Sequence, residues 1–154
     1  WSSDVCSSDL STPQVQMEAL HPPSKLVSGM PPGSNDQSIV LRLQYGRIVI
    51  LLTGDLEEAG IPHVLETKDV QATVLKVPHH GSRLGQAGER LFQAVAPEVA
   101  VISVGNRHGL PAMETVQAIQ ATGARLYTTH RHGMVTIRTD GTQLEVKTFR
   151  KERR

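Results

Sequence analysis

Aspartate and histidine side chains follow three apolar segments of the sequence, at the point where each segment ends. Asp55 follows the first segment after a Thr-Gly turn, His79 and His80 follow the second, and His108 lies in the loop after the third. Apolar runs of this length are typical of buried strands. Imidazole and carboxylate groups are common metal ligands. We therefore expect the three strand ends to lie along one edge of a sheet and to share a metal site.

Asp55 allows two interpretations. A carboxylate at a strand end can bridge two divalent cations, as a two-metal hydrolase requires. Taken alone, Asp55 is more simply explained as the N-cap of a helix that begins at Leu56, because aspartate accepts hydrogen bonds from the first backbone amides of a helix. The histidines at the neighbouring strand ends favour the ligand role.

The adjacent histidines His79 and His80 lie between Pro78 and Gly81. Neighbouring side chains on extended backbone point to opposite sides, so we expect one histidine to face the site and the other to support it or to move protons. Ser82 can cap the next segment or donate to a phosphate. The alternative is a pair of exposed loop histidines, but the proline and glycine that frame them favour a functional role.

The other histidines give weaker signals. His108 is either a solvated loop residue or a further metal ligand. His130 and His132 would point to one face of an extended segment, where they could bind a metal, but the glycine that follows them predicts an exposed turn. His21 and His63 are predicted to be surface or loop residues.

The composition limits the classes of partner. Of the 154 residues, 38% are apolar and only 3% aromatic, so aliphatic side chains must form the core. The net charge of +1 argues neither for nor against a nucleic-acid partner. Without the basic C-terminal tail the rest of the chain is slightly acidic, so no extended basic face is expected. Binding of a phosphodiester would then depend on local charges and metals. The sequence contains no apolar run long enough to span a bilayer and no signal peptide.

Strand and helix patterns alternate through the middle of the chain, and antiparallel hairpins flank them. Strands are predicted at residues 15–20, 39–45, 48–53, 72–77, 99–104, 126–128, 134–138 and 143–148. Helices are predicted at 86–96 and 113–122, with shorter helical pieces from 56 and from 62 to 66. Gly46-Arg47 and Asp140-Gly141 are predicted hairpin turns. This mixed α/β pattern favours a layered sandwich.

Residues 1–10, WSSDVCSSDL, differ from the rest of the chain. They have no apolar periodicity and resemble a translated sequencing adapter, so we exclude them from the fold and assign no role to Cys6. The remainder divides into a partial domain, residues 11–149, and a basic tail, residues 150–154. We expect this chain to be the C-terminal piece of a longer protein.

The order of short motifs along the chain resembles that of a known family. The motifs are Asn35-Asp36-Gln37-Ser38, the segments 51–57, 75–82 and 101–105, and Asp140-Gly141. In this order they are similar to the C-terminal metallo-β-lactamase-like domain of ComEC-type DNA internalization competence proteins. The resemblance covers nearly all of residues 15–148.

The resemblance implies an αββα sandwich, of which this chain would be the C-terminal portion, with two divalent metal ions, zinc or manganese. It also implies a parent protein in the cell membrane, whose channel portion admits single-stranded DNA. The domain would lie on the extracytoplasmic side and act as a nuclease on the strand that is not imported. By this carry-over Asp55 is expected to be the bridging metal ligand, and His79 and His80 are expected to be site residues with either ligand or proton-transfer roles. We assign Asp55, His79 and His108 as metal ligands, and His80 and Ser82 as catalytic residues.

The chain departs from the family pattern at two ligand positions. The family often has a histidine directly before the proline of the third loop, where this chain has Leu110, and His108 is the nearest histidine. No His/Asp cluster of the H-x-H-x-D-H kind precedes Asp55. We therefore expect the chain by itself to be inactive, to hold metal weakly or not at all, and to leave a sheet edge and part of a core uncovered.

The leading interpretation is a piece of a metal-dependent phosphodiesterase or DNA nuclease that acts in natural transformation. One alternative is a non-catalytic module that guides DNA along the uptake channel. Another is a hydrolase of the same fold that acts on small molecules.

Overall fold

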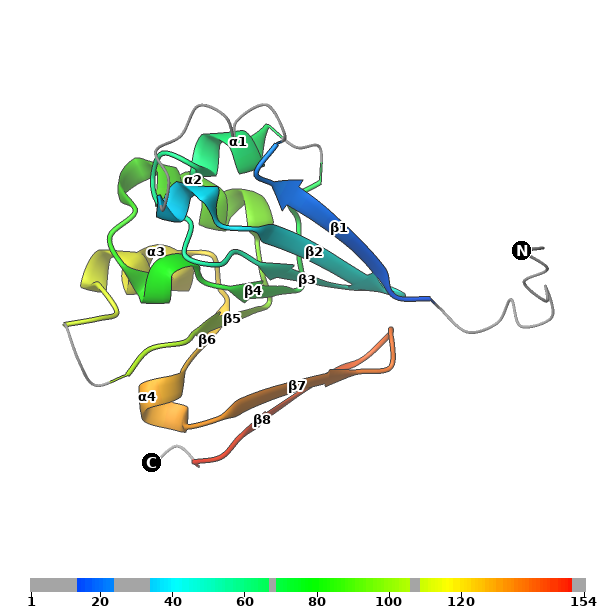
Figure 1. The fold of residues 1–154 in the computed structure, drawn as a ribbon. Coiled ribbons are helices and arrows are strands. Elements are labelled where there is room, and N and C mark those ends of the chain that lie inside the picture. Colours follow the sequence, from blue (N-terminus) through cyan, green and yellow to red (C-terminus); the bar gives the residue numbers. More distant parts are fainter. Residues whose placement is uncertain (1–13, 24–33, 67–68, 106–108, 151–154) are drawn as a thin grey trace, which may run out of the picture.

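The computed structural model describes residues 14–23, 34–66, 69–105 and 109–150 of the chain. In this part six strands form one sheet, in sequence order, and two more form a separate hairpin (Figure 1). The strands of the sheet are β1 (Gln16–His21), β2 (Val40–Tyr45), β3 (Ile48–Leu52), β4 (Val74–Lys76), β5 (Val99–Ile102) and β6 (Arg125–Thr128). The hairpin strands are β7 (Val135–Thr139) and β8 (Leu144–Thr148). All eight predicted strands are present, with ends displaced by at most two residues.

The sheet combines an antiparallel and a parallel half. β1, β2 and β3 are antiparallel, and the predicted tight turn at Gly46-Arg47 joins β2 to β3. β3 to β6 are parallel, so that Leu51 lies opposite Leu75 and Leu75 opposite Ala100. Parallel neighbours need crossover connections, which here contain the helices. The carboxyl ends of β3, β4 and β5 therefore meet at one edge of the sheet, as the sequence predicted.

Helices cover one face of the sheet, which makes the fold mixed α/β (Figure 1). They are α1 (Ile61–Leu65), α2 (Gly85–Val95) and α3 (Met113–Ala121). Two 3-10 turns, η1 (Asn35–Gln37) and η2 (Pro78–Gly81), and the short helix α4 (Thr129–His132) complete the described elements. α2 and α3 confirm the two longer predicted helices. Among the described residues no helix has the length and apolar character needed to cross a membrane.

The predicted helical piece that begins at Leu56 is wrong. Leu56 and Glu57 have no regular secondary structure, residues 58–60 form a turn, and α1 begins only at Ile61, with Pro62 in its first turn as predicted. The reason is a competing acceptor: the backbone N–H groups of Glu57 and Gly60 donate to Asp36 Oδ1 at 3.1 and 2.7 Å. Because no helix starts here, Asp55 is not a helix N-cap.

The core lies between the sheet and the three helices. Leu51, Leu75 and Ala100 of the sheet pack there with Leu91 and Phe92 of α2, all of them at most 1% exposed. Side chains alternate between the faces of a strand, so their neighbours point to the other face. Ile48, Val74 and Val99 on that face are buried, but several other apolar side chains there are only half-buried; they include Leu41, Leu43, Ile50, Leu52 and Val101.

The β7–β8 hairpin lies on the side of the sheet away from α1, α2 and α3 (Figure 1). Its turn contacts the β2–β3 turn, where Arg47 N donates to Gly141 O at 2.7 Å. The turn is closed by Asp140, whose Oδ1 accepts from Thr142 N, Thr142 Oγ1 and Gln143 N. These hydrogen bonds stabilise the carboxylate and lower the pKa of Asp140 from 3.8 to about 2.

Two expectations about histidines are wrong. His21, expected at the surface, is 1% exposed: its Nε2 donates to Asp36 O at 2.8 Å, and its ring stacks on that of His63. The segment of His130 and His132 forms a turn, the helical turn α4, as the glycine after it predicted, but the turn is not exposed at His132. His132 is buried against the edge of the Tyr127 ring. Both buried histidines therefore have structural contacts that their local sequence does not encode.

Candidate active site

Polar groups from three neighbouring strands meet at the carboxyl edge of the sheet. Asp55 lies three residues after β3, Lys76 is the last residue of β4, and Ser103 directly follows β5. Two hydrogen bonds tie the first two strand ends together: Thr53 Oγ1 donates to Lys76 O at 2.6 Å, and His79 N donates to Gly54 O at 3.3 Å.

Asp55 and His80 face each other across this edge. His80 Nε2 lies 3.6 Å from Asp55 Oδ2, and each side chain is a little under half exposed. The other ring nitrogen, Nδ1, lies 2.6 Å from Ser103 O. A carbonyl oxygen only accepts, so Nδ1 carries a proton and donates to Ser103 O, and Nε2 is the ring nitrogen turned towards Asp55. A metal-binding histidine commonly donates its other ring N–H to a carbonyl in this way.

Lys76 occupies the other side of the Asp55 carboxylate. Its Nζ lies 3.6 Å from Asp55 Oδ1 and donates a hydrogen bond to Gly54 O. Burial lowers the pKa of Lys76 from its usual value, and the charge and hydrogen bonding of Asp55 act in the opposite direction. Lys76 gives no signal of a site residue in the sequence, because it stands inside an otherwise apolar strand.

His79 points to a different partner from its neighbour. Its Nδ1 lies 3.0 Å from Glu57 Oε1, an oxygen that also accepts from Asn35 Nδ2 at 3.0 Å. The expectation of extended backbone is wrong, since His79 and His80 have φ of 41° and 54°. Positive φ is unfavourable for residues with a Cβ, and strained backbone of this kind is concentrated at functional sites. The strain directs the two imidazoles to two separate carboxylates.

Ser82 and His79 both line a cavity next to the Asp55–His80 pair. Its backbone N donates to His79 O at 2.9 Å, and its carbonyl accepts from Thr115 Oγ1 at 2.6 Å. Its own hydroxyl is buried, and no group in the described part of the chain accepts from it or donates to it. A hollow of about 600 Å³ is lined by Ser82 and His79 together with Asp36, Glu57, Glu58, Ala59 and Arg83.

The supporting residues come from the segment before β2. Ser38 Oγ accepts from Asp55 N at 3.1 Å, and Asp36 holds the backbone at Glu57 and Gly60. Both belong to the Asn35–Ser38 motif, to which the sequence reading gave no physical role. These contacts join residues that are 17 to 24 positions apart in the chain.

The described residues fit a metal ion only in part. Asp55 Oδ2 and His80 Nε2 are two ligand atoms on one side of the site. In a tetrahedral zinc site, two ligand atoms about 2 Å from the ion stand roughly 3.3 Å apart, close to the observed separation. Within the described ranges no three His, Cys, Asp or Glu side chains are grouped so that they could hold an ion. The predicted ligand His108 lies outside the described residues.

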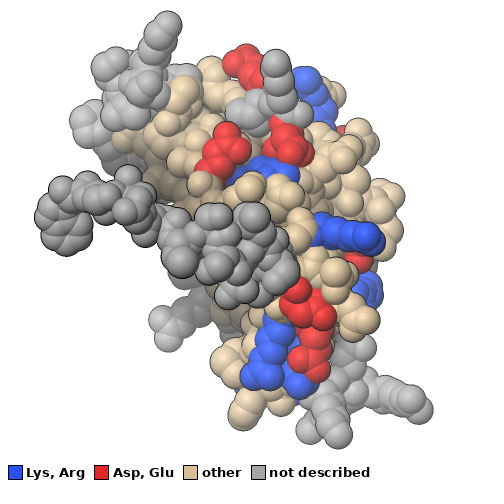
Figure 2. Space-filling model, turned by 90° about the vertical axis from the view of Figure 1, so that its right-hand side faces the viewer, with Lys and Arg blue, Asp and Glu red and all other residues tan. Residues whose placement is uncertain are grey.

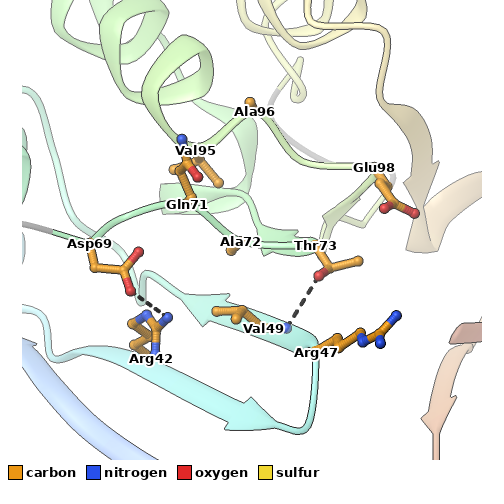
Figure 3. Close-up of a pocket in the computed structure, with 10 residues that line it drawn as sticks. All are labelled: Arg42, Arg47, Val49, Asp69, Gln71, Ala72, Thr73, Val95, Ala96 and Glu98. Atoms are coloured by element: carbon orange, nitrogen blue, oxygen red, sulfur yellow. Dashed lines mark hydrogen bonds and ion pairs between the residues drawn. The ribbon is translucent and has the colours of Figure 1, made fainter. Parts of the chain in front are cut away.

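A second hollow lies at the opposite edge of the sheet, by the amino ends of β4 and β5. It has a volume of about 400 Å³ (Figure 3). Arg42 and Asp69 form an ion pair of 2.6 Å across it, and Val49 N donates to Thr73 Oγ1. None of the predicted site residues that are described lines it. Glu98, on its rim, is an exposed carboxylate far from the candidate site and serves below as a control.

The visible surface carries no large patch of one charge. In Figure 2 basic and acidic side chains lie next to one another on the face turned to the viewer, with uncharged residues between them. This agrees with the small net charge of +1. An anionic partner would therefore have to be recognised by local groups rather than by a broad positive field.

Comparison with known proteins adds three relatives. The chain is 37% identical over 111 residues to ComE operon protein 3 of Bacillus subtilis (strain 168) and 34% identical over 103 residues to competence protein ComA of Neisseria gonorrhoeae. The chain is related to the ComEC-type competence proteins. It is also 35% identical over 113 residues to the uncharacterized protein YcaI of Escherichia coli (strain K12).

These matches cover 64% to 70% of this chain but only 14% to 15% of each relative. The chain thus spans about one seventh of the length of the ComEC-type proteins that it matches. No family model matches it. No solved structure matches it either.

Proposed function

We propose that this chain forms part of a metal-dependent phosphodiesterase domain of a DNA-uptake protein. The observation that carries the proposal is the pair formed by Asp55 and His80 at the carboxyl edge of the sheet, with the His80 tautomer fixed by Ser103 O. Two relatives are named as a competence protein and as a ComE operon protein, which supports a role in the uptake of DNA.

In this proposal the two histidines have different tasks. Asp55 and His80 would contribute ligands to a divalent ion, which would supply an activated water and stabilise charge on a phosphodiester. Glu57 orients His79 through Nδ1, which leaves the second ring nitrogen of His79 to move a proton during the reaction. This is the reverse of the order taken from the sequence, where His79 was the expected ligand and His80 the expected catalytic group.

Ser82 and His108 have supporting roles in the proposed site. The hydroxyl of Ser82 is buried beside His79, so in the proposal it donates to a phosphate oxygen only when substrate fills the neighbouring hollow. His108 is proposed as a further ligand on the loop after β5. The remaining ligands would come from polypeptide outside this chain.

The finer fold that we propose is the αββα sandwich. One face of the sheet is covered by α1, α2 and α3, whereas the other presents half-buried apolar side chains such as Leu43 and Ile50. A second sheet packed on that face would bury them. The β7–β8 hairpin already lies on that side of the first sheet (Figure 1).

The proposed partners follow from the same relationship. DNA is the substrate, and a membrane channel in the parent protein delivers it. The domain works at the cell membrane, on its extracytoplasmic side, where incoming DNA is first accessible.

The test is a chimera in which residues 14–150 replace the matching segment of ComE operon protein 3. The chimera is expected to cut DNA when manganese or zinc is added and to lose at least about a hundredfold in rate in the Asp55→Asn variant, since a metal ligand is removed. Glu98→Gln removes a carboxylate at the opposite edge and is expected to keep full activity. Full activity of Asp55→Asn would contradict the assignment.

A second candidate function is a non-catalytic module that guides DNA. It is favoured by the lack of a three-residue ligand group in the described residues. The same chimera separates the two functions. DNA binding without bound metal and without cleavage would support the guiding module.

A further inference from the structure

The end of the β7–β8 hairpin next to α4 carries two exposed apolar side chains. Val135 lies opposite Thr148 in the hairpin, and one residue further on Phe149 N donates to Met134 O at 2.9 Å. Residues directly opposite each other in an antiparallel pair have their side chains on the same face, with Cβ atoms about 5 Å apart. Met134 and Phe149 are 66% and 77% exposed, so this Met134–Phe149 pair projects into solvent.

The pair lies on the outer face of the hairpin. Ile137 and Val146, on the other face, are half-buried, whereas Arg138 and Lys147 share the face of the Met134–Phe149 pair and are exposed. This pattern follows from the alternation of side chains along a strand. The Met134–Phe149 pair is therefore separate from the half-buried apolar surface that the proposed sandwich would bury.

Two arginines lie at the same end of the hairpin. Arg131 is an exposed residue of α4, which stands beside the start of β7 and the end of β8 (Figure 1). Arg150 directly follows Phe149. Its backbone N donates to His132 O at 2.8 Å and its Nη1 donates to His130 O at 3.1 Å, which holds this arginine against α4.

The positive charge of the hairpin is balanced near its turn but not near α4. Towards the turn Lys147 Nζ lies 2.8 Å from Glu145 Oε1. The sequence has no acidic residue in 129–139 or in 146–151. The Met134–Phe149 pair is thus flanked by cationic groups on both strands, and an anionic partner with an apolar interior would complement both features.

We propose that this end of the hairpin binds the surface of an anionic lipid bilayer, with Met134 and Phe149 at the acyl boundary and Arg131 and Arg150 on lipid phosphates. The inference rests on the proposed location of the domain at the cell membrane. Apolar side chains beside basic ones are typical of segments that lie on a membrane surface, where each basic residue adds attraction to anionic lipid. Single-stranded DNA also attracts arginine, but its bases stack on flat rings, which methionine lacks. A bilayer accommodates all four side chains.

The test is co-sedimentation of the 154-residue chain with vesicles of mixed phosphatidylglycerol and phosphatidylcholine, and with vesicles of phosphatidylcholine alone. The chain is expected to bind the anionic vesicles on the order of tenfold more tightly, and added salt is expected to remove this difference. Phe149→Ala is expected to weaken binding to anionic vesicles on the order of tenfold, because an apolar side chain no longer leaves water. Arg131→Gln is expected to weaken it about fivefold.

Two matched controls remove similar side chains elsewhere. Met17→Ala changes a methionine that is 68% exposed on β1, and Arg90→Gln changes an exposed arginine of α2. Both variants are expected to bind vesicles as wild type does. Because all four substitutions are at exposed positions, the variants are expected to stay folded.

Equal binding to both kinds of vesicle, or equal affinity of wild type, Phe149→Ala and Arg131→Gln, would overturn the proposal. Binding of a short oligodeoxythymidylate is measured with the same variants. If the two substitutions weakened that binding and left vesicle binding unchanged, the occupant would be DNA and the proposal would be wrong. These results leave the phosphodiesterase proposal standing, whereas full DNA cleavage by the Asp55→Asn chimera would overturn that proposal and leave the lipid contact standing.

Discussion

Asp36 is predicted to be the main structural support of the loop that carries the candidate site. Its Oδ1 accepts from the N–H groups of Glu57 and Gly60 at 3.1 and 2.7 Å, and its backbone carbonyl accepts from His21. The substitution Asp36→Ala removes the first two hydrogen bonds and leaves the third. Asp36→Asn keeps an oxygen at the same place and removes only the charge.

The size of the effect follows from these contacts. Gly60 is buried, so that its N–H loses its partner without free access to water, and Glu57 is half-buried. Leaving a buried donor without a partner costs about 1–3 kcal/mol, and a bond to a half-buried donor contributes about 1 kcal/mol. Asp36→Ala is therefore expected to lower the free energy of unfolding by about 2–4 kcal/mol, and Asp36→Asn by about 1 kcal/mol.

Urea denaturation of the three proteins measures both values, and amide hydrogen exchange at Gly60 locates the change. Exchange at Gly60 is expected to be fast in Asp36→Ala and close to wild type in Asp36→Asn. If the two variants lost the same stability, or if Gly60 stayed protected in Asp36→Ala, the carboxylate would not be the support of this loop.

Two further predictions concern the hairpin and the core. The folded pKa of Asp140, about 2, lies below the usual 3.8, so the carboxylate stabilises the fold above the unfolded pKa and this advantage is lost as the pH falls through about 2. Wild type is thus expected to be more stable than Asp140→Asn at neutral pH and equal to it near pH 2. Thermal melts of both proteins across this pH range measure the difference in stability. A difference that did not change with pH would refute the stabilising role of the Asp140 carboxylate. Phe92→Ala in the core is expected to lose about 3–5 kcal/mol, whereas Phe149→Ala, at a position 77% exposed, should stay within about 0.5 kcal/mol of wild type in urea denaturation.

The arrangement of the site could be predicted where it depends on strand patterns. The apolar runs of β3, β4 and β5 identify buried strands, and buried strands joined by helices are parallel. Parallel strands end at one edge, which places Asp55 and His80 together without any knowledge of side-chain contacts. The same patterns predicted α2 and α3, because their apolar positions repeat with helical spacing.

The local geometry of the histidine pair could not be predicted in this way. The positive φ values of His79 and His80 are set by the surrounding fold rather than by residue preference, since left-handed backbone is rare outside glycine. The direction in which each imidazole points follows from that backbone. Lys76 was missed for a related reason: strand periodicity explains its position but says nothing about where its long side chain ends.

The contacts between segments that are distant in the chain also could not be predicted from the sequence. Asp36, His21 and Gly60 meet only after the chain has folded, and nothing in their neighbouring residues marks them as partners. The same holds for His132, which was expected in an exposed turn and is buried in a helical turn. Residue type predicts what such groups can bind, but the tertiary fold decides what they meet.

The central claim is that Asp55, together with His80, holds the metal ion of a phosphodiesterase. Its most direct measurement is the rate of DNA cleavage by the chimera with added Mn²⁺, compared between wild type, Asp55→Asn and Glu98→Gln. Cleavage is expected to require the metal, to be lost in Asp55→Asn and to be kept in Glu98→Gln. Cleavage at the wild-type rate by Asp55→Asn would contradict it.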